Sequence, residues 1–86
     1  METIEDMIKQ LVADWLGVND DQVKPDADII NDLGADDLDF VELIMAIEEE
    51  FAIAITEDEA EKVNTPADAA ELVKSKLGQK WPFEKQ

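Results

Sequence analysis

The chain has 86 residues, of which 45% are hydrophobic and 35% charged, and this suits one small globular domain with a modest core. It contains no cysteine and no histidine, which excludes disulfides, thiolate metal sites and histidine-based catalysis. The net charge is -16, and the interval between Lys24 and Lys62 holds 14 acidic residues and no basic one, so we expect no binding to nucleic acids or anionic membranes.

The same charge predicts association with partner proteins that carry basic patches, and this association should weaken with salt. No apolar run approaches the length of a transmembrane helix, and the N-terminal segment METIEDMIKQ lacks the plan of a signal peptide. We therefore expect a cytoplasmic protein that does not insert into membranes.

Residues 3 to 16 are predicted to form the first helix, because their apolar residues recur at spacings of three and four. Thr3 and Asp6 resemble a capping box, and Gly17 is a typical helix stop. We expect Trp15 to be a core anchor.

Residues 18 to 36 form a long connection, which we expect to be anchored in the core by Val23, Ile29, Ile30 and Leu33. Asp26 and Asp28 match the first two ligand positions of a calcium-binding EF-hand loop, but Ile30 occupies the third. No metal site is predicted there.

Residues 37 to 51 are predicted to form an acidic amphipathic helix, and Asp36 and Asp37 are both favourable capping residues for its start. One face carries apolar residues at helical spacing, namely Leu38, Val41, Ile44, Met45 and Phe51. The outward face is negative, and Phe40, Val41 and Met45 lie on or near it. The pattern fits a docking surface, but periodicity alone favours a solvated face beside ordinary core residues.

The remaining segments complete the predicted fold. Residues 52 to 55 alternate like a strand but have no partner strand, so we expect a short buried linker. Thr56 and Glu59 predict a short helix over residues 57 to 62. Thr65, Pro66 and Asp68 predict a last helix over 66 to 77, ended by Gly78.

Together these elements predict an all-α fold, a small four-helix bundle with three main helices, one short helix and a long first loop. We place the domain at residues 1–78 and a C-terminal tail at 79–86. The tail contains the segment Trp81-Pro82-Phe83, whose role the sequence leaves open.

Three motifs give the chain a family resemblance: LGV at 16–18, DLGADxLDxVELxMAxEEEF at 32–51 and EDEAEKVxT at 57–65. Together they resemble the acyl carrier proteins over residues 2–77. The resemblance implies a helical bundle in fatty acid or polyketide metabolism that is not itself an enzyme. In that family a serine carries 4′-phosphopantetheine through a phosphodiester, and the thiol of this arm carries the acyl chain.

Asp37 occupies the position of that serine, and the only serine in the chain is Ser75. We therefore expect no attached cofactor as the chain is written. Asp37 fits an engineered replacement that locks a carrier in its unmodified form, or a native variant that has lost covalent chemistry. It also fits a simple helix cap that partly imitates the charge of a phosphate.

The resemblance also implies a partner-binding surface, in which acidic residues pair with arginines and lysines of partner enzymes beside apolar contacts. The matching acidic residues are Asp36, Asp39, Glu42, Glu48 and Glu49, and the matching apolar residues are Val41, Met45 and Ile55.

These observations predict two alternative functions for the chain. The first is a monomeric carrier-like module that docks on acyl-carrier-dependent synthases or transferases through its acidic second helix. The second is a non-carrier regulatory or structural subunit that uses the same face, for instance as a decoy. An enzyme built on paired carboxylates such as Asp36 and Asp39 lacks a histidine to assist it, and the specific motif argues against an acidic mimic of nucleic acid.

Overall fold

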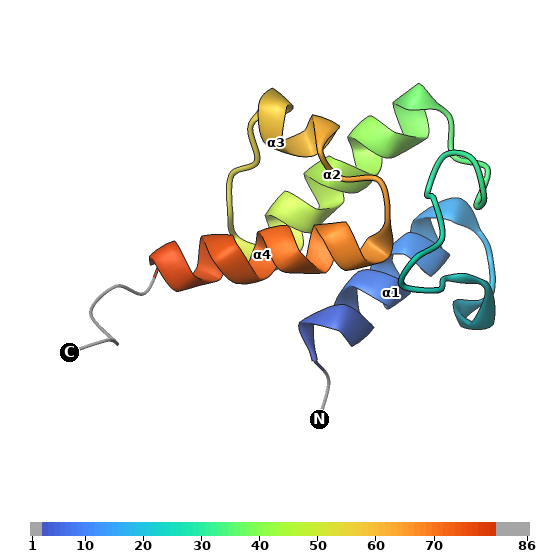
Figure 1. The fold of residues 1–86 in the computed structure, drawn as a ribbon, viewed down its shortest axis with the longest axis horizontal. Helices are drawn as coiled ribbons and strands as arrows, with labels where there is room; N and C mark the ends of the chain where they lie inside the picture. The colour runs from blue at the N-terminus through green and yellow to red at the C-terminus, as the bar shows by residue number, and fades with distance from the viewer. Residues whose placement is uncertain (1–2, 81–86) are drawn as a thin grey trace.

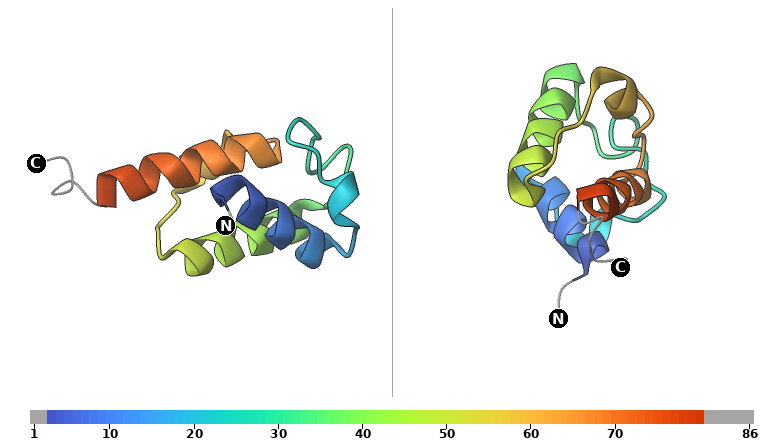
Figure 2. Two further views of the ribbon diagram at one scale, coloured as in Figure 1. Left: turned by 90° about the horizontal axis from the view of Figure 1, so that it is seen from below. Right: turned by 90° about the vertical axis from the view of Figure 1, so that its left-hand side faces the viewer.

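The computed structural model describes residues 3–80, and over this range the chain forms four α-helices and one short 3-10 helix. In chain order the elements are α1 (Ile4–Leu16), η1 (Asp20–Gln22), α2 (Asp37–Phe51), α3 (Glu57–Glu61) and α4 (Pro66–Lys80). α1 packs against both α2 and α4, and α3 lies beside α2 (Figures 1 and 2). The predicted all-α bundle is confirmed. Within the described range, none of the helices is long and apolar enough to span a membrane.

The predicted limits of α1 are confirmed by its caps. The Asp6 amide donates to Thr3 Oγ1 at 3.1 Å, and the Thr3 amide donates to Asp6 Oδ2 at 3.3 Å, so two amides of the first turn have partners. Gly17 ends the helix with a φ of 70°, a left-handed conformation that suits glycine. The prediction for Trp15 is wrong: its side chain is 47% exposed. It lies in the last turn of α1, past the fully buried Ile8 and Val12.

The connection between α1 and α2 is fixed to the rest of the fold by backbone hydrogen bonds. The Ile29 amide donates to the carbonyl of Asn64 at 2.8 Å, and the Ala67 amide donates to the carbonyl of Pro25 at 3.0 Å. Val23 and Ile29 are buried as predicted and Leu33 is partly buried, whereas Ile30 is exposed, which is a correction.

Acidic residues of this connection form turns. Asp28 Oδ1 accepts hydrogen bonds from the amides of Ile30 and Asn31, and Asp32 Oδ2 accepts from the amide of Asp28. Gly34 then takes a φ of 82° on the approach to α2. The aspartates therefore satisfy backbone donors that the irregular loop leaves without helical partners.

The core-facing side of α2 differs from the predicted stripe. Leu43, Ile44, Ile47 and Phe51 are buried, whereas Leu38, Val41 and Met45 are 65%, 53% and 56% exposed. Of the predicted apolar face, Ile44 and Phe51 are therefore buried, Val41 and Met45 are exposed as expected of residues on or near the outward face, and Leu38 is exposed as well. Two apolar sets at helical spacing lie on this helix, and periodicity alone does not tell which one is covered by α1.

α2 ends at an unusual residue. Ala52 takes a φ of 55° and a ψ of 49°, the left-handed conformation that glycine usually occupies at this position. Residues 52–55 then form a turn and linker without a strand, as predicted. The predicted burial is only partly correct, because Ile53 and Ile55 are partly buried against the core whereas Ala52 and Ala54 are exposed.

The last two helices begin at the predicted residues, and each start has a capping box, of which the one at Thr56 was predicted. Thr56 accepts from the Glu59 amide, and Thr65 accepts from the Asp68 amide, each at 3.1 Å. α4 buries Ala69, Ala70 and Val73. It continues through Gly78 to Lys80, so the predicted end at residue 77 is wrong; a glycine within a helix costs only about 1 kcal/mol. The aromatic segment 81–83 lies outside the described residues.

Candidate functional site

The N-terminus of α2 is held by two carboxylates. Asp36 is the N-cap residue: its Oδ1 accepts from the Asp39 amide at 2.7 Å, and its own amide donates to Asp39 Oδ2 at 3.4 Å. Both side chains thus accept hydrogen bonds from backbone amides that have no acceptor within the helix. Their negative charge is also favourable beside the positive end of the helix dipole. The spacing of three residues between them is explained by this capping box without any catalytic role.

Asp37 is the first residue of α2, and its side chain is exposed. Within residues 3–80 its carboxylate has no hydrogen bond or ion pair, in contrast to the carboxylates on either side. Asp36, rather than Asp37, supplies the cap. The exposed carboxylate of Asp37 is therefore not required by the local helix start.

No alcohol side chain lies at this helix start. The three threonines of the chain accept amide hydrogen bonds at the starts of α1, α3 and α4, and Ser75 lies in α4. A phosphodiester requires a hydroxyl oxygen on the protein, and position 37 offers a carboxylate instead.

Three large apolar side chains, Leu38, Val41 and Met45, stand exposed at successive spacings of three and four along α2. We refer to these three residues as the α2 ridge. Large apolar side chains grouped on the surface of a small protein mark contact sites more often than isolated ones do. The resemblance predicts Val41 and Met45 as partner contacts, whereas Leu38 was not among the predicted contacts.

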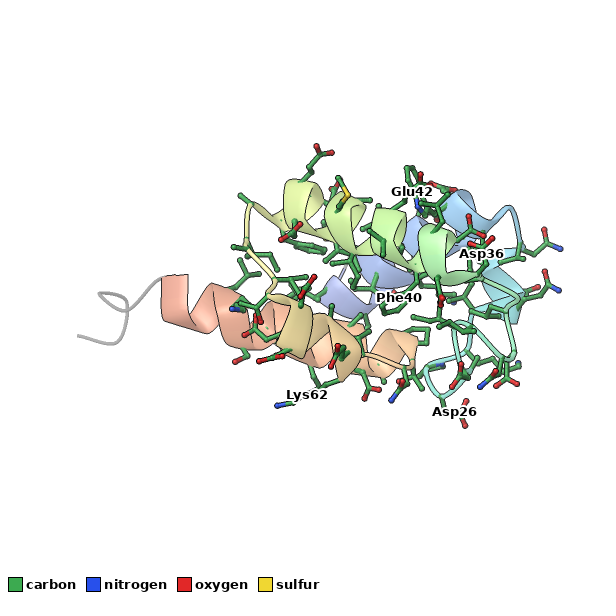
Figure 3. All side chains as sticks on the ribbon, turned by 90° about the horizontal axis from the view of Figure 1, so that it is seen from above. Asp26, Asp36, Phe40, Glu42 and Lys62 are labelled. Carbon is green, nitrogen blue, oxygen red and sulfur yellow. The ribbon has the colours of Figure 1, made fainter. Side chains whose placement is uncertain are left out.

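The predicted acidic residues at the start of α2 and along it differ in exposure, and Asp39 is partly buried with its Oδ2 accepting from the Asp36 amide. Glu42 and Glu49 are exposed, as are Asp36 and Asp37, and Figure 3 shows Asp36 at the start of the helix and Glu42 on its outer side. Glu48 is partly buried, and its Oε2 accepts a hydrogen bond from the Ile55 amide at 2.7 Å. Glu48 therefore joins α2 to the linker that precedes α3, a structural role that the sequence did not reveal.

A groove of about 400 Å³ separates α2 from α3. Phe40 points into this space from the side of α2 that faces α3 (Figure 3). The predicted contact Ile55 lies in the same groove and is partly buried. The groove is lined by Phe40, Val41, Ile44, Met45, Glu48, Ile55, Thr56, Glu57, Ala60 and Glu61. The α3 residues of this lining were not predicted, because the sequence pattern does not show that the short helix lies beside α2.

A second cleft, of about 250 Å³, lies between α1, the loop around Pro25 and the start of α4. It contains none of the predicted site residues. Among residues 3–80, no group of three or more acidic side chains is arranged to hold a metal ion.

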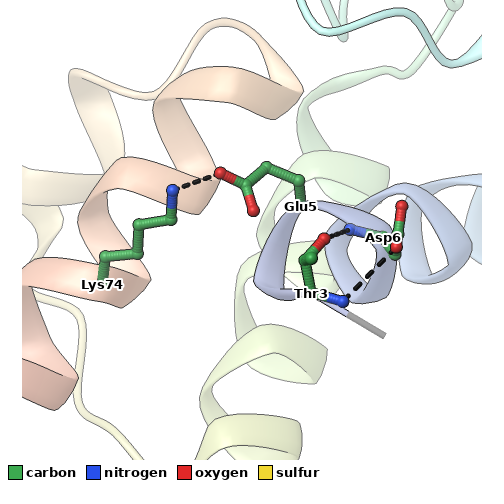
Figure 4. Close-up of polar contacts among 4 residues, drawn as sticks. All are labelled: Thr3, Glu5, Asp6 and Lys74. Carbon is green, nitrogen blue, oxygen red and sulfur yellow. Dashed lines mark hydrogen bonds and ion pairs between the residues drawn. The ribbon is translucent and has the colours of Figure 1, made fainter. Parts of the chain in front are cut away.

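Two ion pairs join α4 to its neighbours. Lys74 pairs with Glu5 of α1 (Figure 4), and Lys76 pairs with Glu59 of α3 at 2.7 Å. The hydrogen bond from Lys74 lowers the pKa of Glu5, and the one from Lys76 lowers the pKa of Glu59. Neither of these ion pairs involves a carboxylate of α2, and among residues 3–80 the α2 carboxylates form no ion pair.

The family model described as a phosphopantetheine attachment site matches residues 6–73, which include α2, α3, the groove between them and Asp37.

Proposed function

We propose, from the premise that the chain belongs to the phosphopantetheine attachment-site family, that it is a carrier-like module which docks on partner enzymes through α2 but carries no prosthetic arm. Domains of this family are not catalysts; they carry substrates for enzymes. The observation that carries the proposal is that an intact α2 surface accompanies an exposed carboxylate at position 37.

The docking half of the proposal is supported by the composition of the α2 surface. The α2 ridge offers exposed apolar area, and the exposed carboxylates Glu42 and Glu49 lie on the same helix and form no ion pair with any residue between 3 and 80. Apolar contacts provide affinity and unpaired charges provide orientation and fast association with a basic partner. The partners that fit are synthases or transferases of fatty acid or polyketide metabolism.

The absence of an arm follows from chemistry at Asp37. Joining a phosphate to a carboxylate gives a mixed anhydride, which water hydrolyses, whereas a serine gives a stable phosphate ester. The residues at the start of α2 thus do not fit covalently attached phosphopantetheine. We expect the native chain to remain unmodified.

The test is incubation with coenzyme A and a broad-specificity phosphopantetheinyl transferase, followed by intact mass measurement. The native chain should gain no mass. The Asp37→Ser variant should gain one pantetheine phosphate group, because the α2 surface that the transferase contacts is unchanged. Modification of the native chain would refute the proposal, and failure of the variant would indicate that the α2 surface has diverged from that of a carrier.

A regulatory role is the second candidate, and it is favoured by the same pairing of an intact surface with missing chemistry. A protein that occupies the docking sites of acyl-carrier-dependent synthases without delivering a substrate inhibits them. Titration of the native chain into a synthase assay with a loaded carrier protein should then reduce the rate competitively, and more weakly at high salt. Unchanged rates would contradict the regulatory role and would leave a structural subunit as the remaining non-carrier function.

A further inference from the structure

We propose that the cleft between α1, the loop around Pro25 and the start of α4 binds Trp81 of a second copy of this chain, so that copies associate weakly from head to tail. No residue of α2 or α3 lines this cleft, and the inference therefore goes beyond the proposed function. It assigns a role to residues 81–86, whose sequence is Trp-Pro-Phe-Glu-Lys-Gln.

The floor of the cleft is apolar. Val23, Pro66 and Ala70 are buried at its base, and Pro25 and Ala67 add exposed surface at its edge. Its volume of about 250 Å³ suits one large side chain rather than a whole helix. Aromatic side chains are the most effective occupants of such a space, since each buries about 150–250 Å² of surface.

The walls of the cleft are joined to one another before anything binds. The Ala67 amide donates to the Pro25 carbonyl at 3.0 Å, which holds the start of α4 against the loop. The pair of Glu5 and Lys74 holds α1 against α4. A site that is ordered in advance loses less conformational entropy on binding, so a single aromatic anchor gives a measurable complex.

Two charged residues of the cleft lack partners within the chain. Four charged residues line it, and of these Glu5 and Asp6 already accept hydrogen bonds from Lys74 and from a backbone amide. Lys9 and Glu71 form no hydrogen bond or ion pair among residues 3–80, and Lys9 is partly buried. The cleft therefore offers one uncompensated charge of each sign beside an apolar floor.

The segment 81–86 carries the matching set of groups. Its aromatic residues are followed by one acidic and one basic residue, Glu84 and Lys85, and these lie three and four positions after Trp81. An extended chain covers about 10–14 Å over this distance, so both charges reach the rim when Trp81 occupies the cleft. Glu84 then pairs with Lys9, and Lys85 pairs with Glu71.

The length of α4 requires that the occupant come from another copy. α4 continues for nine residues beyond Glu71, to Lys80, and this distance is about 14 Å along the axis. Figure 1 shows the start of α4 beside the long loop and its other end on the far side of the bundle. A tryptophan side chain is shorter than this separation, so Trp81, which directly follows Lys80 in the sequence, does not reach the cleft of its own chain.

The resulting association is weak. One aromatic anchor buries far less than the roughly 1,200 Å² that stable interfaces require, and we expect a dissociation constant of about 0.1 mM. The chain is then the expected monomer at low concentration and forms larger species as concentration rises. Because each copy offers a cleft at one end and a tryptophan at the other, the contact is heterologous and leaves α2 accessible.

The test follows the fluorescence of Trp81. The chain has two tryptophans and no tyrosine. A reporter copy carries Trp15→Phe, a change at an exposed residue outside the cleft lining, so that only Trp81 emits. An acceptor copy carries both Trp15→Phe and Trp81→Ala. Titration of the acceptor up to about 1 mM into about 1 μM reporter should shift the emission to shorter wavelength, with a midpoint of about 0.1 mM.

Two acceptor variants locate the binding site. Ala67 and Ala54 are both exposed, but only Ala67 lines the cleft. Ala67→Leu should raise the midpoint at least about tenfold, and Ala54→Leu should change it less than about twofold, while circular dichroism shows an unchanged helix content for both. Equal midpoints for the two variants, or no shift with the original acceptor, would overturn the inference. Short-wavelength emission from the reporter alone would also overturn it, since Trp81 would then be buried in its own chain.

Reversal of charge tests the pair of Lys9 and Glu84 without altering the apolar floor. Glu84→Lys in the reporter should weaken binding about fivefold, although it makes the reporter less negative and would favour association if only net charge mattered. Combination with Lys9→Glu in the acceptor should restore the midpoint to within about twofold. Tighter binding by Glu84→Lys alone would overturn the placement of the segment 81–86 in this cleft.

Discussion

Replacement of Ala52 by glycine should stabilise the protein. Ala52 ends α2 with a φ of 55°, and a residue with a Cβ in this left-handed region carries a strain of about 1–2 kcal/mol. Glycine removes this strain, but it also raises the conformational entropy of the unfolded chain. This second effect lowers stability by about 0.4–1 kcal/mol. Because Ala52 is exposed, loss of its methyl group opens no cavity. The net gain should be about 0.5–1 kcal/mol, which corresponds to a rise in Tm of about 2–8 °C for a domain of this size.

The matched control is Ala54→Gly in the same linker. Ala54 is also exposed, but its φ is not positive, so glycine there should only lower stability, by about 0.4–1 kcal/mol. Both variants are compared with the native chain by differential scanning calorimetry. A Tm for Ala52→Gly at or below that of the native chain would show that the helix end carries no releasable strain.

Three other outcomes are expected. Glu48→Ala leaves the Ile55 amide without its acceptor and should lower the free energy of unfolding in urea by about 1–3 kcal/mol, whereas Glu49→Ala should change it by less than about 0.5 kcal/mol. Lys76 lowers the pKa of Glu59, so this pair stabilises the fold above the ordinary value of 4.5 and loses its effect as pH falls through the lowered value. The stability difference between the native chain and Lys76→Gln should therefore vanish in acid, and a constant difference would contradict the assignment. Raising salt from about 0.01 M to about 0.1 M shortens the screening length from about 30 Å to about 10 Å, so the Tm of this chain of net charge -16 should rise; a fall would show that attractive pairs dominate.

Helix starts are predictable from this sequence because they depend on local chemistry. Thr3, Thr56 and Thr65 each have an acidic residue three positions later, and each forms a capping box at the predicted helix start. Helix ends are less certain: Gly17 stops α1 but Gly78 does not stop α4. A glycine permits a left-handed turn without requiring one.

Burial depends on neighbours that the local pattern does not specify. α2 carries two apolar sets, and only contact with α1 shows that Leu43 and Ile47 belong to the core while Leu38 does not. The burial predicted for Trp15 is wrong for the same reason. Periodicity gives the direction of a side chain, but it does not tell how far along the helix the neighbouring elements extend.

The candidate site likewise has features that the local sequence predicts and features that depend on distant contacts. The substitution at Asp37 can be recognised from the motif alone, because it concerns which atom is available for a bond. The hydrogen bond of Glu48 and the wall formed by Glu57 and Glu61 require the placement of α3, which is set by contacts far apart in the sequence.

The hydrogen bonds from the long loop to the start of α4 have a consequence for the order of assembly. The amides of Ile29 and Ala67 pair with carbonyls that lie some 35 to 42 positions away along the chain, so neither bond exists until both halves of the polypeptide have met. The two amides should therefore become protected from hydrogen–deuterium exchange in a single step. Shortening the chain before residue 64 should leave both the loop and the approach to Asp37 unprotected.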